Sequence, residues 1–263
     1  MECGLRFYFA HILELEEENT LLMDDMLQNN VIGTVVHYVL EKAVEQGRFK
    51  ELSRQEIESA VCQYMCSEIH LTENDLLYDK NHLVYRIIVK YIEMYLQNMR
   101  SVQDDFLIEQ TEQELKIQLL VDETIPITLK GIIDRVDNCK GQKRIVDYKT
   151  GSMKDKELIV DKVKDMFDGE HGKALQLMFY VYLYYIHYEQ TDMEAEIVSL
   201  RKISQNYTLM IDGISTLSKE MMMEFEQLLK ETVEEILNPH TLFLQTENID
   251  HCKYCAFKDI CRK

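Results

Sequence analysis

Hydrophobic and polar residues follow two different periodicities along the chain, and the first is that of a helix. From the N-terminus onward, apolar residues recur every three or four positions, which is the spacing of one face of a helix. Ser53 stands three residues before Glu56, the arrangement of a capping box, and Gly47 lies near a helix end. The helices predicted in this way cover residues 5–17, 33–48, 53–70 and 81–99.

In the second periodicity, apolar residues alternate with polar ones, as in strands with one buried face. Three such segments predict a meander of strands: 112–121, 125–137 and 143–150. A mostly apolar helix is predicted at 172–188, a fourth strand at 194–201 and an amphipathic helix at 218–238. This order of elements predicts an α/β fold, in which helices flank a mixed central β-sheet.

The second and third predicted strands form a hairpin that carries paired carboxylates. Lys140–Gly141 is the expected two-residue turn, because glycine adopts a positive φ at little cost. That turn places Asp134 directly opposite Asp147 on one face, with Cβ atoms about 4.5–5.5 Å apart. Lys149 falls on the same face as Asp147, because side chains alternate along a strand.

Two opposed carboxylates repel each other, and a divalent cation bound between them usually offsets this repulsion. Hard cations such as Mg²⁺ take oxygen ligands and often only one or two protein carboxylates. A neighbouring lysine can orient a water molecule or stabilise developing negative charge. The hairpin therefore predicts a metal site at Asp134 and Asp147 with Lys149 as a catalytic lysine. The alternative is an exposed hairpin face whose acids are balanced by a surface lysine.

The C-terminal tail holds three of the seven cysteines, Cys252, Cys255 and Cys261, in C-x₂-C-x₅-C spacing. Three close thiolates indicate a metal site, which a fourth ligand would complete. The spacing leaves zinc and an iron–sulfur cluster equally open. A disulfide with one free thiol is the alternative, but the odd cysteine count and the lack of a visible signal peptide favour a reducing cytoplasm. The candidates for the fourth ligand are Cys3, Cys62, Cys66, Cys139 and His251.

Composition and charge limit the classes of function. The hydrophobic content of 46% and charged content of 29% are ordinary for a soluble globular protein. No apolar run approaches the length of a membrane span, so no membrane partner is expected. The net charge of −18 is a poor match for a free-standing nucleic-acid binder, which usually carries a basic excess. A nucleic-acid substrate would require local binding or a partner that supplies positive surface.

Six segments, taken in order, resemble the RecB-type branch of the PD-(D/E)XK nuclease superfamily. Each motif is short, but the ordered combination extends over nearly the whole chain and is highly specific. Within that branch the chain is most similar to the nuclease domains at the C-terminus of AddB helicase–nuclease subunits and to CRISPR-associated adaptation exonucleases. The matching segments are CGLRFYF at 3–9, GTVVHYVLE at 33–41, GIIDRVD at 131–137, VDYKTG at 146–151, QLMFY at 176–180 and the cysteine tail.

The resemblance implies a restriction-endonuclease-like core with additional N-terminal helices, and it assigns roles to individual residues. The implied ligands of Mg²⁺ or Mn²⁺ are His37, Asp134, Asp147 and the backbone carbonyl of Tyr148. Lys149 matches the lysine of the motif. Gln176 and Tyr180, which share a helix face at i, i+4 spacing, match residues that line the site. Without the resemblance, His37 would be an ordinary helical histidine, and Gln176 and Tyr180 an ordinary packing pair.

The resemblance also implies a [4Fe–4S] cluster that ties the two chain ends together. Its ligands would be one early cysteine, matched by Cys3, and the three tail cysteines Cys252, Cys255 and Cys261. Gly4 departs from the pattern, because the family commonly has proline there.

We therefore expect one RecB-like nuclease domain over residues 1–263, excised from a larger chain. Its parts would be a helical N-terminal part (1–110), a catalytic core (111–202), and a C-terminal helix with the cysteine-rich tail (203–263). The expected activity is metal-dependent hydrolysis of DNA, as a cytoplasmic single-strand exonuclease that works with a helicase domain or subunit in repair and recombination. The alternatives are a non-catalytic nuclease-fold module that binds DNA or scaffolds a complex, and a zinc-binding regulator.

Overall fold

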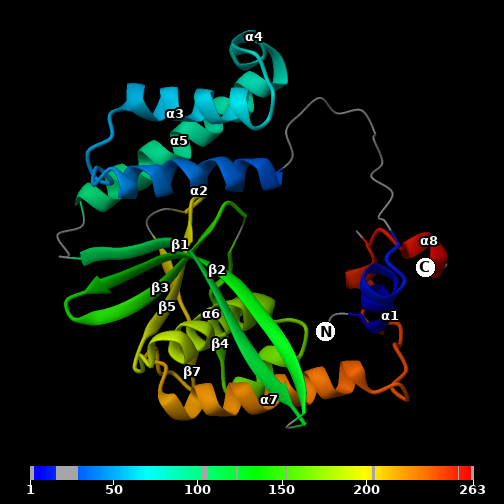
Figure 1. Cartoon of the computed structure of the whole chain (residues 1–263). Coiled ribbons are helices and arrows are strands. Elements are labelled where there is room, and N and C mark those ends of the chain that lie inside the picture. Colours follow the sequence, from blue (N-terminus) through cyan, green and yellow to red (C-terminus); the bar gives the residue numbers. More distant parts are fainter. Residues whose placement is uncertain are drawn as a thin grey trace.

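A five-stranded mixed sheet lies between two layers of helices in the computed structural model (Figure 1). The structure describes residues 3–15, 29–101, 106–122, 124–151, 153–202, 205–253 and 255–261. The strand order is β1-β2-β3-β5-β6, with β3 and β5 parallel and the other neighbours antiparallel. These strands are β1 (Phe106–Val121), β2 (Ile125–Cys139), β3 (Gln142–Lys149), β5 (Glu194–Ser199) and β6 (Asn206–Thr208).

The predicted α/β architecture with a mixed central sheet is confirmed. The four strands expected from alternation are all present, and the helix predicted at 172–188 is α6 (Gly172–Tyr188). Alternation did not predict three short strands, because two or three residues are too few to show a period: β4 (Ile159–Val160), β6 and β7 (Met210–Ile211). Within the residues that the structure describes, no helix combines the length and the hydropathy of a membrane span.

One face of the sheet is covered by the N-terminal helices. Val146 and Tyr148 of β3 and Val198 of β5 point into the apolar core that these helices share. The capping box at Ser53 and Glu56 is present at the start of α3. The helices of this layer are α2 (Asn29–Glu45), α3 (Arg54–Ser67), α4 (Glu73–Leu77) and α5 (Asp79–Ser101).

The other face packs on α6 and α7 (Lys219–Leu237), with the short 3₁₀ turns η2 (Asp155–Glu157) and η3 (Val163–Phe167) beside them. Ile145, the neighbour of Val146 on β3, belongs to this second core. Strand β3 is thus buried on both faces, as is usual where a strand joins a parallel pair covered by helices.

The two chain ends lie side by side (Figure 1). The N–H of Leu5 donates to the carbonyl of Leu244 at 3.1 Å. A Cβ on Gly4 would come within 3.1 Å of the Leu244 backbone, so a residue without a side chain suits this contact. This terminal lobe consists of α1 (Gly4–Phe7), η1 (Tyr8–Ile12), η4 (Ile249–Cys252) and α8 (Lys258–Cys261).

The helix predicted over 5–17 is wrong in its length. The helical part begins at Gly4, continues as the π-helical turn η1 and ends at Ile12. Residues 13–15 are not helical, and residues 16–17 lie outside the described residues. The helix predicted at 33–48 begins earlier and ends earlier, as α2.

The hairpin between β2 and β3 has the predicted turn and register. Lys140 and Gly141 both have positive φ, 54° and 89°, as a type I′ turn requires. The strands pair from Cys139–Gln142 as far as Arg135–Val146, one step before Asp134 and Asp147. Beyond this point β2 stays paired with β1 alone. Strands β2 and β3 therefore separate at Asp134 and Asp147, and we call this point the fork.

Candidate active site

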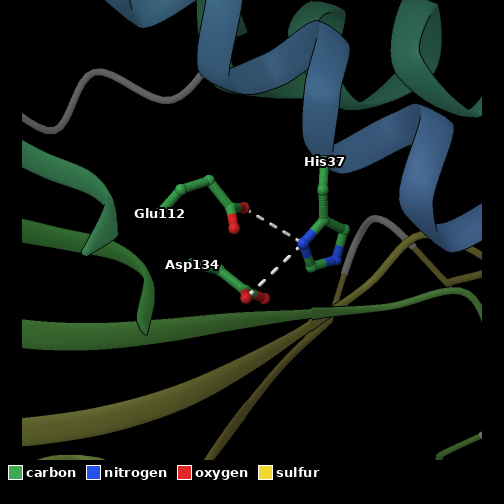
Figure 2. Close-up of side chains that lie close together, drawn as sticks. All are labelled: His37, Glu112 and Asp134. Atoms are coloured by element: carbon green, nitrogen blue, oxygen red, sulfur yellow. Dashed lines mark hydrogen bonds and ion pairs between the residues drawn. The ribbon is translucent and has the colours of Figure 1, made fainter. Parts of the chain in front are cut away.

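Three side chains from different elements converge at this fork. His37 comes from α2, Glu112 from β1 and Asp134 from β2 (Figure 2). The His37 Nδ1 atom lies 3.2 Å from Glu112 Oε1 and 3.4 Å from Asp134 Oδ1. One potential ligand atom of each residue lies within 4.8 Å of the other two. A helix of the N-terminal layer and two adjacent strands therefore supply one compact group of metal-ligand types.

The other ring nitrogen of His37, Nε2, donates to the backbone carbonyl of Tyr148 at 3.3 Å. Burial alone would lower the pKa of His37. The hydrogen bond to Glu112 and the charges of Asp134 and Glu112 outweigh burial and raise this pKa to about 9. Without a cation, the imidazole therefore keeps its proton and donates from both nitrogens, to Glu112 and to Tyr148. To bind a cation, His37 must release the proton from one of these nitrogens.

The Asp134 side chain bridges β2 and β3 at the fork. One of its oxygens, Oδ2, accepts the backbone N–H of Tyr148 at 2.7 Å. Burial is the main cause that raises the pKa of Asp134 to about 7, and the charges of Asp147 and Glu112 also raise it, against the lowering effect of His37. The negative charges of Asp147 and Glu112 therefore disfavour the charged form of Asp134.

Asp147 and Lys149 form an ion pair at the end of β3. The ammonium of Lys149 lies 3.0 Å from Asp147 Oδ2 and donates to Oδ1 at 3.1 Å. Burial raises the pKa of Asp147, and Lys149 opposes that shift. Among the described residues, nothing donates a well-aligned hydrogen bond to the buried Oδ2 atom of Asp147. Its negative charge is balanced by the Lys149 ammonium at 3.0 Å, and carboxylate oxygens are the ligands that hard cations prefer.

Glu112 is the member of this group that the sequence did not predict. Thr111 pairs with Arg135 and Gln113 with Ile133, but Glu112 between them has a φ of +45° and leaves the ladder. A positive φ is uncommon for a residue other than glycine, and such strained positions cluster at functional sites.

The sequence signal for Glu112 is weak, because Glu114 follows it at strand spacing. Glu114 points to solvent and pairs with Lys116 and Lys130. Only the backbone irregularity at Glu112, which tertiary structure decides, distinguishes the two acids.

Gln176 and Tyr180 lie on the face of α6 that approaches the fork. The amide of Gln176 donates to the hydroxyl of Tyr180 at 2.8 Å. Burial raises the pKa of Tyr180, and the charges of Asp147 and Asp134 contribute to the rise, which places this phenol near the carboxylates. A Cβ on Gly131 would meet the Tyr180 ring at 3.2 Å. The glycine of the GIID segment therefore allows α6 to pack closely on β2.

A buried polar network supports the fork from the opposite face of the sheet. Arg135 donates to the hydroxyls of Tyr95 at 2.5 Å and Tyr148 at 2.8 Å. It also pairs with Asp137 at 3.0 Å, which Arg144 holds in turn at 2.8 Å. Because the Tyr148 backbone contacts both His37 and Asp134, fixing its side chain also fixes the geometry of the site.

The four cysteines singled out by resemblance line one pocket in the terminal lobe: Cys3, Cys252, Cys255 and Cys261. Of the other candidates for the fourth ligand, His251 also lines this pocket, whereas Cys62, Cys66 and Cys139 are not among its lining residues. Cys62 and Cys66 lie on α3, and Cys139 lies at the end of β2. Within the described part of the chain, no three cysteine sulfurs come within 4.8 Å of one another.

Comparisons with known proteins identify relatives of this chain. Residues 1–262 match the family model of the PD-(D/E)XK nuclease superfamily. An ATP-dependent helicase/deoxyribonuclease subunit of Staphylococcus haemolyticus (strain JCSC1435) is 24% identical in an alignment of 201 residues. The alignment covers 68% of this chain but only 16% of that relative. The crystal structure of SSO0001 has 17% identity and a TM-score of 0.32, with 98% of this chain and 95% of that chain covered. With a family model matched over almost its whole length, the chain belongs to the PD-(D/E)XK nuclease superfamily.

Proposed function

We propose that this chain is a Mg²⁺- or Mn²⁺-dependent nuclease that hydrolyses DNA phosphodiester bonds. The observation that carries the proposal is the convergence of His37, Glu112 and Asp134 beside the Asp147–Lys149 pair. Imidazole and carboxylate donors suit Mn²⁺, and carboxylates with a backbone carbonyl suit Mg²⁺. Membership of the nuclease superfamily supports the same reaction class.

In this proposal the ion is held by His37, Asp134, Asp147 and the backbone carbonyl of Tyr148. A bound divalent ion polarises the phosphate and lowers the pKa of a coordinated water molecule. Asp134 is already oriented for this role by the Tyr148 amide, which fixes one of its two oxygens. Glu112 lies 3.2 Å from His37 and adds a further carboxylate to the ligand set.

Lys149 supplies positive charge where the transition state develops negative charge. Its ammonium is held by Asp147 yet remains partly exposed, with 29% of the side chain accessible. It can therefore reach a phosphate oxygen or the attacking water from a fixed position. Gln176 and Tyr180 present an amide and a phenol on the same side and would position a water molecule or the phosphate.

We further propose a single-strand exonuclease that works within a helicase–nuclease in DNA repair and recombination, in the cytoplasm. The support is the relative whose name describes an ATP-dependent helicase/deoxyribonuclease subunit. The net charge of −18 fits a nuclease domain that receives its strand from a partner, because a free-standing binder would rely on its own basic surface. Residues 1–263 would form one nuclease domain of that assembly.

For the four-cysteine pocket we propose a [4Fe–4S] cluster at Cys3, Cys252, Cys255 and Cys261. Tetrahedral zinc with bonds of about 2.3 Å needs sulfurs only about 3.8 Å apart. In a cubane cluster each thiolate binds a different iron, so the sulfurs lie farther apart. The support for a cluster is that the four cysteines singled out by the resemblance line one pocket.

The proposed function is tested with end-labelled linear single strands, circular single strands and duplexes. We expect Mg²⁺ or Mn²⁺ to support degradation of the linear single strand and EDTA to stop it. An exonuclease leaves the circle intact, whereas cleavage of the circle would replace the exonuclease by an endonuclease. The absence of cleavage of every substrate with either metal, in protein whose cluster is loaded, would favour the non-catalytic alternative.

A further inference from the structure

Beside the candidate active site, an apolar groove lies between α6, α7 and the N-terminal segment. Its partly exposed side chains include Phe7, Phe167, Leu175 and Phe179. Gln176 and Leu229 also line it. None of the described residues that line this groove is charged, in a chain whose net charge is −18. An uncharged, aromatic surface of this kind suits an apolar or planar ligand.

The groove and the candidate active site are connected along α6 through Gln176. Gln176 lines the groove and also donates to the hydroxyl of Tyr180, the phenol whose pKa the carboxylates of the fork help to raise. Phe179 is the sequence neighbour of Tyr180, and Leu175 lies one helical turn before Phe179. Gln176 therefore links the groove to the Tyr180 phenol beside the fork.

We propose that this groove receives an unpaired nucleobase of the DNA strand, next to the phosphate that is cut. The inference rests on the proposed function and names the part of the substrate that the site recognises. A strongly acidic chain gains little from phosphate contacts, whereas stacking on an aromatic side chain does not depend on charge and accepts every base. A base held within a duplex presents no free face to Phe179 or Phe167. The groove thus predicts a preference for single strands.

Binding in EDTA tests the groove without any need for cleavage. The fluorescence anisotropy of a labelled single strand of about 12 nucleotides gives the dissociation constant. We expect Phe179→Leu, which keeps an apolar side chain but removes the ring, to weaken binding about tenfold, and Phe179→Tyr to restore it. The matched control is Tyr188→Leu, which removes an aromatic ring, 40% exposed, from the far end of the same helix. It should leave binding unchanged.

A second measurement needs only the natural protein. Strands with one abasic nucleotide, moved along the sequence, should bind about tenfold more weakly at one or two positions. In Phe179→Leu the same abasic strands should lose nothing more, because the ring that the base contacts is gone. Equal binding of all abasic strands by the natural protein would overturn the proposal, and so would an undiminished affinity of Phe179→Leu for the intact strand.

The outcomes separate this proposal from the proposed function. Phe179-dependent binding without any cleavage in Mg²⁺ or Mn²⁺ would remove the nuclease assignment and keep the groove. Cleavage that is unaffected by Phe179→Leu, together with unchanged binding, would keep the nuclease and remove the groove. Light scattering examines another occupant: a dimer of the natural protein that Phe179→Leu converts to monomers would assign the groove to a second copy of the chain and overturn the proposal.

Discussion

The fork of the sheet and the four-cysteine pocket are two candidate metal centres built in opposite ways. Asp134, Asp147 and Lys149 come from one hairpin, whose turn sets their register, and the sheet around them is buried by helices on both faces. The pocket joins Cys3 to a tail at the other end of the chain. Its short helices contribute little core of their own, since none of α1, η1, η4 and α8 contains a buried residue.

This difference separates what a metal does in each place. At the fork, packed strands hold the ligands whether or not an ion is bound, so the ion serves chemistry rather than folding. In the terminal lobe, ligand bonds between distant chain segments would add folding energy directly. Changes at the fork should therefore affect rate and metal affinity, whereas changes at the pocket should affect stability.

The largest expected effect is the loss of activity when the Asp147–Lys149 pair is broken. Asp147→Ala removes a buried carboxylate, and Lys149→Ala removes the charge that stabilises the transition state. Each should lower the cleavage rate by at least about 10²–10³-fold, with iron content and melting temperature close to those of the natural protein. Initial rates on a labelled single strand and thermal melting measure both.

The matched control for that prediction is Glu114→Ala, which removes an exposed acid on the neighbouring strand β1. Its rate should equal that of the natural protein. Substantial activity in both Asp147→Ala and Lys149→Ala would contradict the assignment of the fork as the catalytic centre.

The sequence predicted the positions of Asp134 and Asp147 in the hairpin better than those of Glu112 and His37 around them, for a physical reason. A two-residue turn with glycine fixes the pairing of a hairpin, so the positions of Asp134 and Asp147 follow from local chemistry. Glu112 could not be predicted, because its φ of +45° is uncommon for glutamate and nothing in the sequence distinguishes it from Glu114. The resemblance, not periodicity, pointed to His37, since only tertiary packing brings α2 to the sheet.

The second largest effect should follow from Cys255→Ser. If a cluster joins the chain ends, this change should remove iron from anaerobically purified protein and lower the melting temperature by at least about 5 °C. Mn²⁺ affinity at the fork should change little, because the proposed ligands there come from α2, β1, β2 and β3 and not from the terminal lobe. Iron analysis, absorbance and thermal melting provide the readouts.

Cys62→Ser is the matched control, because Cys62 lies on α3 and does not line the pocket. It should keep both the iron and the melting temperature. A variant Cys255→Ser that retains the natural iron content and melting temperature would refute the cluster, and stoichiometric zinc in place of iron would correct its identity.

A smaller effect, on Mn²⁺ affinity, should show whether Glu112 belongs to the ligand set. The sequence predicted His37 as a ligand but not Glu112, which the structure places beside it. His37→Ala and Glu112→Gln should each raise the dissociation constant for Mn²⁺ about tenfold. Because the two side chains touch at 3.2 Å, the double variant should lose less than the product of the single losses. Calorimetric titration with Mn²⁺ gives these constants.

Glu45→Gln, an exposed change on the same helix as His37, serves as the control and should bind Mn²⁺ normally. An effect of His37→Ala without any effect of Glu112→Gln would return the site to the ligands implied by the resemblance. Unchanged affinity in both would make His37 an ordinary helical histidine.

The smallest effect concerns pH and again separates the two centres. In EDTA, the folded protein holds a proton on His37 up to a pKa of about 9, whereas the unfolded chain releases it near 6.5. The folded state therefore binds more protons between these values, so the stabilisation from His37 is complete below 6.5 and is lost as pH rises towards 9. The melting temperature should fall by about 2–6 °C over this range. His37→Ala should flatten the fall, whereas Cys255→Ser should lower the whole curve without changing its slope. A slope that His37→Ala leaves intact would show that other groups govern the stability of the fork.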